Sequence, residues 1–354
     1  MTEAVRFAGF DPGNSGLKVA LWEGGRINYC FIPNLTGPDI EMVAYPKGDQ
    51  LSTLGVEVLS AEDERYRERM LVGELALAQL QKDAYQDRSR AKALGDGVNV
   101  IVPAVLAALD DGRPWVIGVG ATLKDVKSQA ELIVQRLKRS HTVKFIYGPG
   151  ARLDPVRTMV LDVSVYPQAA AGIYGMVRND DDSICSEYAD LLDKNILGLD
   201  CGHGQWNGIV LQQMVPQTPS KFCLDEGYVR VVMAVREYLD RNFFIPATIP
   251  QLQKAVQDEC FLINNKRIDL VAVVDRAITE IVEKAYREAR ETIEPMVFAG
   301  LNEIWLLGGA ASKLAPFVEA RFDLPVNGVP APLLANARGL MFFAKSEWEG
   351  RHHG

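Results

Sequence analysis

Two short glycine-rich turns, each introduced by an aspartate at the end of an apolar run, constrain the fold of this chain more than any other feature. The first turn, Asp11–Gly16, follows the apolar run Val5–Phe10. The second turn, Asp200–Gln205, follows Ile196–Leu199. A further strand-like run comes after each turn, so each turn is expected to join two antiparallel strands. Because the pattern recurs about half a chain later, the sequence predicts two homologous domains.

The length of the chain also favours two domains, since 354 residues exceed what one hydrophobic core usually serves. We expect both domains to be of the α/β class. The first is expected to cover 1–166 together with 335–354, with a small subdomain at about 33–95. The second is expected to cover 167–334, with a small subdomain at about 213–295.

Composition and charge exclude several classes of protein. Apolar residues make up 48% and charged residues 24%, which is ordinary for a globular protein. The net charge of -8 argues against direct coating of nucleic acid or of an anionic membrane. The longest apolar run, Val100–Leu109, is interrupted by Pro103 and is too short to span a bilayer. With five scattered cysteines, no CxxC pair and no signal-peptide pattern before Val5, we expect a cytoplasmic protein.

The remaining patterns predict alternating strands and helices. Strands are expected at Leu17–Trp22, Arg26–Ile32, Trp115–Gly120, Thr142–Tyr147, Val156–Val165, Trp206–Gln212 and Glu303–Leu307. Helices are expected at Lys124–Ser140, Gly227–Arg241, Ile249–Gln257, Leu270–Ile293, Lys313–Arg321 and Asn336–Lys345, and a buried helix at Val98–Leu109, alone or after a strand. We expect the charged stretch Ala61–Arg69 to form a solvated helix, and His352 and His353 to lie in a disordered tail.

The two turns carry residue types that suit polyphosphate. Glycine backbone N–H groups can point inward without obstruction by a Cβ atom. An aspartate beside such a turn can hold a magnesium ion through water, and Lys18 could place a positive charge near the phosphate oxygens. Each turn taken alone is also compatible with a plain strand-connecting hairpin, because aspartate, proline and glycine are favourable turn residues. The segment Leu306–Ala311 would allow its backbone to approach a flat ligand closely. It is also compatible with a simple strand-to-helix turn.

Taken in order, these motifs resemble those of a known superfamily. The segments are Asp11–Lys18, Tyr166–Gln168, Asp200–Gln205 and Leu307–Ala310. They resemble the motif set of the superfamily that joins actin, the large heat-shock chaperone ATPases and the sugar kinases. Within it, the chain is similar to the bacterial actin-like plasmid-segregation ATPases of the ParM/StbA group. The resemblance covers nearly the whole chain and implies two duplicated ribonuclease-H-like domains with a nucleotide cleft between them.

The resemblance also implies roles for individual residues. The expected nucleotide-binding residues are Gly13, Asn14, Ser15, Gly16, Lys18, Gly202, His203, Gly204, Gln205, Glu226, Gly308, Gly309 and Ala310. Asp11 and Asp200 match the family positions that hold Mg²⁺ through water, and Gln168 matches the residue that orients the attacking water. The segments Gln168–Gly172 and Pro332–Gly339 resemble the two connecting motifs at the domain hinge. The second turn departs from the family pattern, since it has His203, Gln205 and Trp206 where a hydroxyl residue is usual.

The implied function is a filament-forming actin-like ATPase that polymerises with Mg²⁺ and ATP or GTP. Its partners would be further copies of itself and a DNA-bound adaptor for plasmid segregation, without direct contact to nucleic acid or membrane. A small-molecule kinase of the same superfold is the alternative; such kinases commonly use an aspartate base, and Gln168 occupies the candidate position. A chaperone-type ATPase and a scaffold without hydrolysis are further alternatives. The stretch Ala61–Arg69 could be a filament contact instead of a solvated surface.

Overall fold

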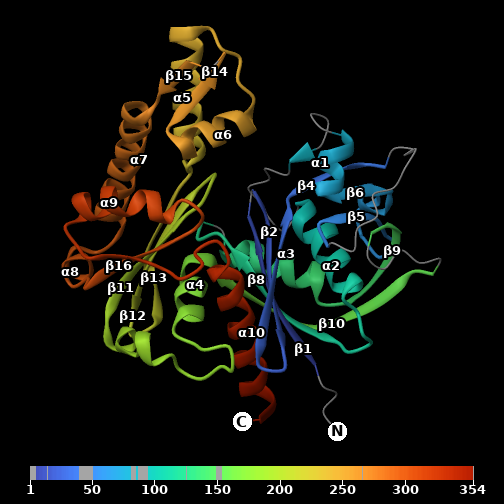
Figure 1. Ribbon diagram of the computed structural model, residues 1–354. Helices are drawn as coiled ribbons and strands as arrows, with labels where there is room; N and C mark the ends of the chain where they lie inside the picture. The colour runs from blue at the N-terminus through green and yellow to red at the C-terminus, as the bar shows by residue number, and fades with distance from the viewer. Residues whose placement is uncertain are drawn as a thin grey trace. The chain divides into compact units, whose positions relative to one another are not determined.

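The computed structural model describes residues 5–13, 15–39, 51–80, 85–86, 95–124, 126–148, 154–264 and 266–353. The chain divides into two compact units (Figure 1). Unit 1 consists of Met1–Ala189 and Leu333–Gly354, and unit 2 of Asp190–Pro332. The sequence predicts the first division after residue 166, whereas unit 1 continues to Ala189. The helix α4 (Gln168–Met176) packs along the C-terminal helix α10 (Ala335–His353), and both helices belong to unit 1.

Unit 1 is organised around a mixed β-sheet. In this sheet β1 (Arg6–Pro12) pairs antiparallel with β2 (Gly16–Glu23) on one side and parallel with β8 (Trp115–Ala121) on the other. β3 (Arg26–Pro33) pairs with β2, and β10 (Val156–Pro167) pairs parallel with β8. The sheet continues through β9 (Ser140–Tyr147), β5 (Thr53–Val58), β6 (Met70–Gly73), β4 (Leu35–Pro38) and β7 (Tyr85–Gln86).

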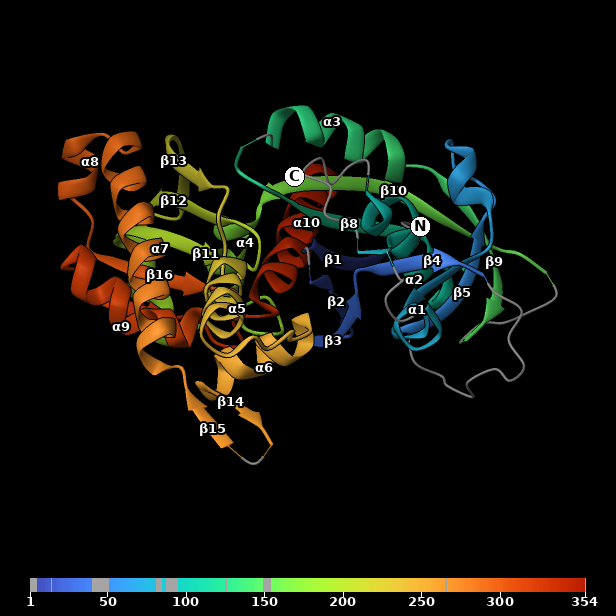
Figure 2. The same cartoon turned by 90° about the horizontal axis from the view of Figure 1, so that it is seen from above.

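Helices cover both faces of this sheet. Ala8 and Phe10 of β1 pack in one core cluster with a π-helix (Gly97–Ile101), with α2 (Val102–Ala108) and with α3 (Val126–Leu137), which lies over β8 and β10 (Figure 2). Phe7, the neighbour of Ala8, packs instead with α10. This alternation follows from the strand geometry, in which successive side chains point to opposite faces. A short helix α1 (Glu74–Leu80) packs on β4 and β6.

Unit 2 contains a smaller sheet with its helices. Its five strands are β13 (Val215–Leu224), β12 (Trp206–Gln212), β11 (Asn195–Cys201), β16 (Glu303–Leu307) and β17 (Val326–Gly328), in that order across the sheet. A separate hairpin consists of β14 (Cys260–Ile263) and β15 (Lys266–Asp269). The helices are α5 (Val229–Phe243), α6 (Ile249–Asp258), α7 (Val271–Thr292), α8 (Pro295–Ala299) and α9 (Ala311–Phe322).

The two units repeat one arrangement of strands. In unit 1 the order β3-β2-β1-β8-β10 has two antiparallel pairings followed by two parallel pairings. In unit 2 the order β13-β12-β11-β16-β17 has the same pairings in the same sequence. Asp11 lies in β1 and Asp200 in β11, so the two turns occupy corresponding positions of a duplicated fold. This confirms the prediction of two duplicated α/β domains.

Several local expectations were wrong. α10 continues to His353, and the His352 ring stacks on Trp348 with 3.8 Å between ring centroids, so the tail is helical. Within 61–69 only Glu64–Arg67 is helical, as one 3₁₀ turn in which the Tyr66 side chain is buried. β13, β17, the β14–β15 hairpin and α8 were not anticipated from the sequence.

None of the helices in the described ranges combines the length and the apolar character that a membrane crossing requires.

Candidate functional site

The first turn of unit 1 places a carboxylate and an ammonium group side by side. Asp11 and Lys18 face each other across the β1–β2 ladder, with 3.5 Å between Lys18 Nζ and Asp11 Oδ2. Only 4% of the Asp11 side chain and 11% of the Lys18 side chain are exposed. Because two buried charges are stable only when they compensate each other, this pair is a structural unit as well as a charged site.

Gln168 joins this pair from a distant part of the sequence. The parallel pairing of β10 with β8, and of β8 with β1, brings the end of β10 and the start of α4 to the end of β1. The buried Gln168 side chain donates a hydrogen bond from Nε2 to Asp11 Oδ1. Gly120 makes room for it, since a Cβ atom at Gly120 would lie 2.8 Å from Gln168 Cγ. The donated bond fixes the amide, and Gln168 Oε1 is left as the acceptor.

The loop after Asp11 is held by backbone contacts. The Gly13 N–H donates to the Gly16 carbonyl at 3.1 Å. Asn34, buried at the end of β3, donates from Nδ2 to the Gly13 carbonyl at 3.3 Å and from its backbone N–H to the Ser15 carbonyl at 3.4 Å. Ser15 is exposed, whereas the predicted site residue Asn14 lies outside the described residues. These backbone and Asn34 contacts therefore hold the loop around Gly13 and Gly16, and the Lys18 ammonium group lies beside Gly13.

The second turn, in unit 2, has the same backbone arrangement with different side chains. Asp200 faces Asn207 across the β11–β12 ladder, the position that Lys18 takes in unit 1. Gly308, which follows β16, lies close to this aspartate. It has φ +89°, and a Cβ atom there would lie 2.6 Å from the Cys201 carbonyl oxygen and 3.1 Å from Asp200 Oδ1. A glycine is required at 308 by both the backbone conformation and the available space.

The loop 202–205 is shaped by the start of α5. Tyr228 N–H donates to the Gly202 carbonyl at 3.1 Å, and Val229 N–H donates to the His203 carbonyl at 2.8 Å. Gly227 allows this approach, since a Cβ atom there would be 2.4 Å from the His203 carbonyl oxygen. Gln205 donates from Nε2 to Asp225 Oδ1 at 2.9 Å. The Gln205 side chain therefore supports the loop, which gives the departure from the family pattern a structural role.

The predicted adenosine-side residues also lie in unit 2. Gly308, Gly309 and Ala310 form the turn between β16 and α9, with Ala310 as the N-cap of α9. Glu226 carries two ion pairs, to Lys284 at 2.6 Å and to Arg230 at 3.6 Å. The Glu226–Lys284 pair ties the start of α5 to α7 and is more than one third exposed on the lysine side, so it remains accessible to a polar ligand.

The supporting roles of several residues were not predicted from the sequence, although the helix that starts at Gly227 was. Asn34, Gly120, Asp225, Gly227 and Lys284 each position a predicted site residue. Gly120 and Gly227 adjoin predicted elements, and a glycine at such a boundary is a usable signal of close packing. Asn34 and Lys284 lie in ordinary strand-end and helical surroundings, and nothing in the local pattern marks them.

Each turn presents one aspartate carboxylate, Asp11 in unit 1 and Asp200 in unit 2. Carboxylate oxygens are the hard donors that Mg²⁺ prefers. Within the described ranges, no group of three or more His, Cys, Asp or Glu side chains could hold a metal ion by itself. Mg²⁺ usually keeps several waters and is held by one or two carboxylates together with phosphate oxygens. The neighbouring thiol of Cys201 is fully buried, and burial raises its pKa well above the usual value, so it is a neutral packing group.

The strand order and the two corresponding turns define a protein with the actin-like ATPase fold, made of two duplicated ribonuclease-H-like domains. Solved structures with this fold match nearly the whole chain. The archaeal actin homologue Ta0583 superposes with a TM-score of 0.75 at 14% identity, covering 97% of this chain and all of its own. ParM in a 15-stranded filament from Clostridium botulinum gives 0.73 at 17% identity, covering 97% of this chain and 99% of its own. Bacillus thuringiensis ParM with AMPPNP gives a TM-score of 0.65 at 13% identity, covering 97% of this chain and 99% of its own.

The likeness is one of fold. Neither a protein-family model nor a curated protein matches the sequence. The neighbours nevertheless include nucleotide complexes, since the archaeal actin homologue was also solved with ADP. The chain therefore has a ParM-like and actin-like fold.

Proposed function

We propose that this protein is an actin-like nucleoside triphosphatase that binds Mg²⁺ with ATP or GTP and assembles into filaments. The observation that carries the proposal is the buried set of Asp11, Lys18 and Gln168 at the end of β1. A carboxylate, an ammonium group and an oriented amide beside a glycine loop are the groups that phosphoryl transfer to water requires. Neighbours of the same fold include a filament and complexes with ADP and AMPPNP, which supports the proposal.

Each residue of this set has a separate task in the proposed reaction. Lys18 offsets charge that develops on the phosphate oxygens. Gln168 is too weakly basic to deprotonate water, so it acts by accepting a hydrogen bond from the water at Oε1 and holding it in line. Asp11 fixes the Gln168 amide through the bond from Nε2. Backbone N–H groups of the glycine-rich turn after Asp11 and of the turn Gly202–Gln205 would bind phosphate oxygens.

Asp11 and Asp200 would hold the magnesium ion through its waters, and the ion would neutralise phosphate charge when bound. Gly308, Gly309 and Ala310 would lie against the nucleoside, and Glu226 would accept a hydrogen bond from its ribose. A carboxylate already paired with Lys284 has a fixed orientation, which lowers the entropic cost of such a bond.

The biological role that we propose is plasmid DNA segregation in the cytoplasm. The filament would act through a DNA-bound adaptor protein, because a chain with a net charge of -8 is poorly suited to binding DNA directly. Nucleotide state would set the conformation of the subunit and hence growth or disassembly of the filament.

The proposal is tested by adding Mg-ATP or Mg-GTP to the purified protein and following light scattering, pelleting and phosphate release together. We expect assembly that depends on the nucleotide, followed by phosphate release without any added acceptor. Turnover that occurs only when a sugar or organic acid is added would replace this proposal with the small-molecule kinase. Binding and assembly without phosphate release would indicate a scaffold that does not hydrolyse nucleotide.

A further inference from the structure

The short connection between β3 and β4 lies against the first turn. Asn34 is the single residue between Pro33, the last of β3, and Leu35, the first of β4. Its backbone N–H donates to the Ser15 carbonyl, and its side-chain amide donates to the Gly13 carbonyl. Both acceptors are main-chain atoms. The contact therefore fixes the backbone of the turn, whatever side chains the turn carries.

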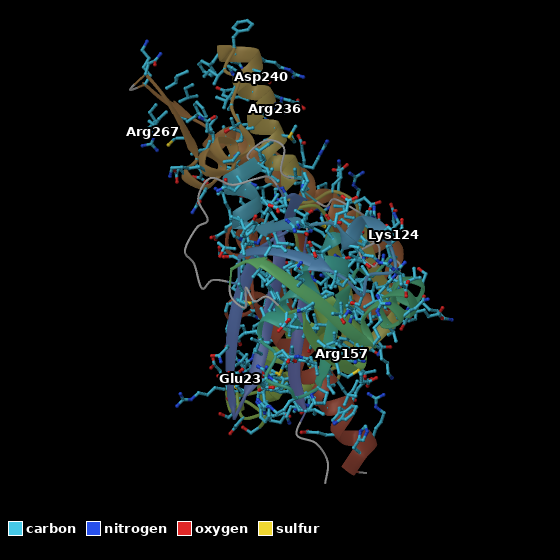
Figure 3. All side chains as sticks on the ribbon, turned by 90° about the vertical axis from the view of Figure 1, so that its right-hand side faces the viewer. Glu23, Lys124, Arg157, Arg236, Asp240 and Arg267 are labelled. Atoms are coloured by element: carbon cyan, nitrogen blue, oxygen red, sulfur yellow. The ribbon has the colours of Figure 1, made fainter. Side chains whose placement is uncertain are left out.

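The direction of the strands explains why Asn34 lies beside the turn. β2 leaves the turn at Gly16 and ends at Glu23, which Figure 3 labels at the lower left. β3 starts at Arg26 and runs back antiparallel to β2, so its last residue, Pro33, faces Gly16. The residue that follows β3 is thereby returned to the turn from which β2 started.

A second contact anchors the same connection two residues further along the chain. The Thr36 hydroxyl donates a hydrogen bond to a carboxylate oxygen of Asp96. Both residues are buried, with 1% of Thr36 and 8% of Asp96 exposed. Asp96 directly precedes the π-helix Gly97–Ile101, which continues into α2, and the N-terminal end of a helix favours a negative charge. A hydroxyl bonded to a buried carboxylate makes a strong hydrogen bond, so Thr36 has a fixed position.

The start of the π-helix also contacts the turn and Asn34. A Cβ atom at Gly97 would lie 3.7 Å from Asn34 Oδ1 and 3.7 Å from Pro12 Cβ, which is an ordinary van der Waals separation. Residues 34–36 therefore contact the turn at one end and the residues before α2 at the other. π-Helical turns are rare in proteins and occur frequently at functional sites.

Unit 2 makes a similar contact at its own turn. β13 ends at Leu224, and the next residue, Asp225, accepts a hydrogen bond from Gln205 of the second turn. In both units the residue directly after the third strand bonds to the glycine-rich turn. Different side chains make this contact in the two units, so the position is what the two units share.

We propose that Asn34 is a positioning residue of the first turn and that the bond from Thr36 to Asp96 holds Asn34 in place. The Gly13 and Ser15 carbonyls point toward Asn34, which keeps two partial negative charges away from a bound phosphate. This inference rests on the proposed nucleotide function for the identity of the anion. Contacts between the turn and phosphate exist in the ground state and the transition state alike, so weakening them raises KM and leaves kcat nearly unchanged.

Thr36→Val tests the anchor because it removes the hydroxyl donor and keeps the shape of the side chain. It should raise the KM for Mg-ATP or Mg-GTP about fivefold to tenfold, with kcat within about twofold of the wild type. Thr36→Ser keeps the donor and should return KM to within about twofold of the wild-type value. Asn34→Ala removes the direct contact and should raise KM at least about tenfold.

Thr158→Val is the matched control. Thr158 also lies in unit 1 and is 1% exposed, and its hydroxyl has no hydrogen-bond partner in the described ranges. Loss of a hydroxyl without a partner should leave KM and kcat at their wild-type values.

Hydrogen–deuterium exchange of the nucleotide-free protein tests the same contacts without any ligand. A peptide that spans the first turn should exchange at least about threefold faster in Thr36→Val and Asn34→Ala than in the wild type, Thr36→Ser or Thr158→Val. β8, which lies inside the same sheet, should remain protected on this timescale in every variant.

The outcomes separate this inference from the proposed function. If KM and exchange of the turn are unchanged in Thr36→Val and Asn34→Ala, the positioning role is refuted. If Thr36→Ser behaves like Thr36→Val, the bond to Asp96 is not the anchor. If kcat falls while KM is unchanged, or if β8 loses protection together with the turn, these residues only stabilise the fold and the inference is wrong. If the wild type neither binds nor hydrolyses nucleotide, the proposed function fails, and the exchange experiment alone decides whether Asn34 positions the turn.

Discussion

The two turns have the same backbone and different charge. In unit 1, Asp11 faces Lys18 across its hairpin, and in unit 2, Asp200 faces Asn207 at the same spacing. Asp11 is therefore neutralised by a cation of its own unit, while the facing group at Asp200 is a neutral amide. Duplication of a fold preserved the position of the carboxylate but did not preserve its electrostatic surroundings. We therefore expect removal of each aspartate to have a different effect on nucleotide turnover and on the free energy of unfolding.

The largest effect is expected from Asp200→Ala. Its loss should reduce turnover of Mg-ATP or Mg-GTP by about a thousandfold or more, since the facing residue Asn207 offers no second carboxylate to hold the metal. Steady-state phosphate release measures this. Asp258→Ala is the control, because Asp258 is an accessible carboxylate of unit 2 paired with Lys254. Turnover within tenfold of the wild type would remove Asp200 from the metal site.

Asp11→Ala should differ from Asp200→Ala in stability. It leaves the Lys18 ammonium, with 11% of its side chain exposed, without its carboxylate, and this should cost about 3 kcal/mol in the free energy of unfolding. Asp200→Ala leaves a neutral facing residue and should lower the free energy of unfolding by less. Urea unfolding of both variants without nucleotide gives the comparison. Equal losses would mean that the Asp11–Lys18 pair does not stabilise unit 1.

Acid should weaken unit 1 through a buried histidine. Burial lowers the pKa of His141 to about 4, against an ordinary value near 6.5, and its ring nitrogen lies 2.9 Å from the Leu137 carbonyl. Folding therefore favours the neutral ring, so its contribution to stability is complete above pH 6.5 and is lost as the pH falls toward 4. The loss should be about 2 kcal/mol by pH 4.5.

Urea titrations at pH 7 and pH 4.5 measure this loss. The variant His141→Gln keeps a donor for the Leu137 carbonyl, and its free energy of unfolding should differ less between the two pH values. An identical pH dependence in the variant would exclude His141 as the source.

The smallest effect separates two glutamines beside the turns. Gln168→Ala should slow hydrolysis about tenfold to a hundredfold while nucleotide affinity is retained, because the residue positions water and does not bind phosphate. Gln205→Ala should change turnover less than threefold, since its amide supports the loop through Asp225. Single-turnover hydrolysis with separate measurement of nucleotide affinity tests both. If Gln205→Ala slowed hydrolysis more than Gln168→Ala, the roles assigned to these two glutamines would be wrong.

Much of the fold followed from the sequence because its strands and helices are strongly patterned. The runs around both turns, the strands at β8, β10 and β16, and the helices α5, α6, α7 and α9 agree with the predicted segments to within a few residues. Errors came where local signals were weak or misleading. The β14 and β15 strands have four residues each and are too short to show an alternating pattern. In 61–69 the many charged residues indicate a solvated surface, although Tyr66 among them is buried.

The sequence by itself determined which residue types stand at the two turns, because aspartate and glycine at the end of an apolar run are local features. Only the tertiary structure decided what surrounds them. Gln168 reaches Asp11 through two parallel strand pairings, and Asn34 reaches the Gly13 loop across the sheet. Pairing between distant segments depends on strand order and packing, which no local periodicity contains.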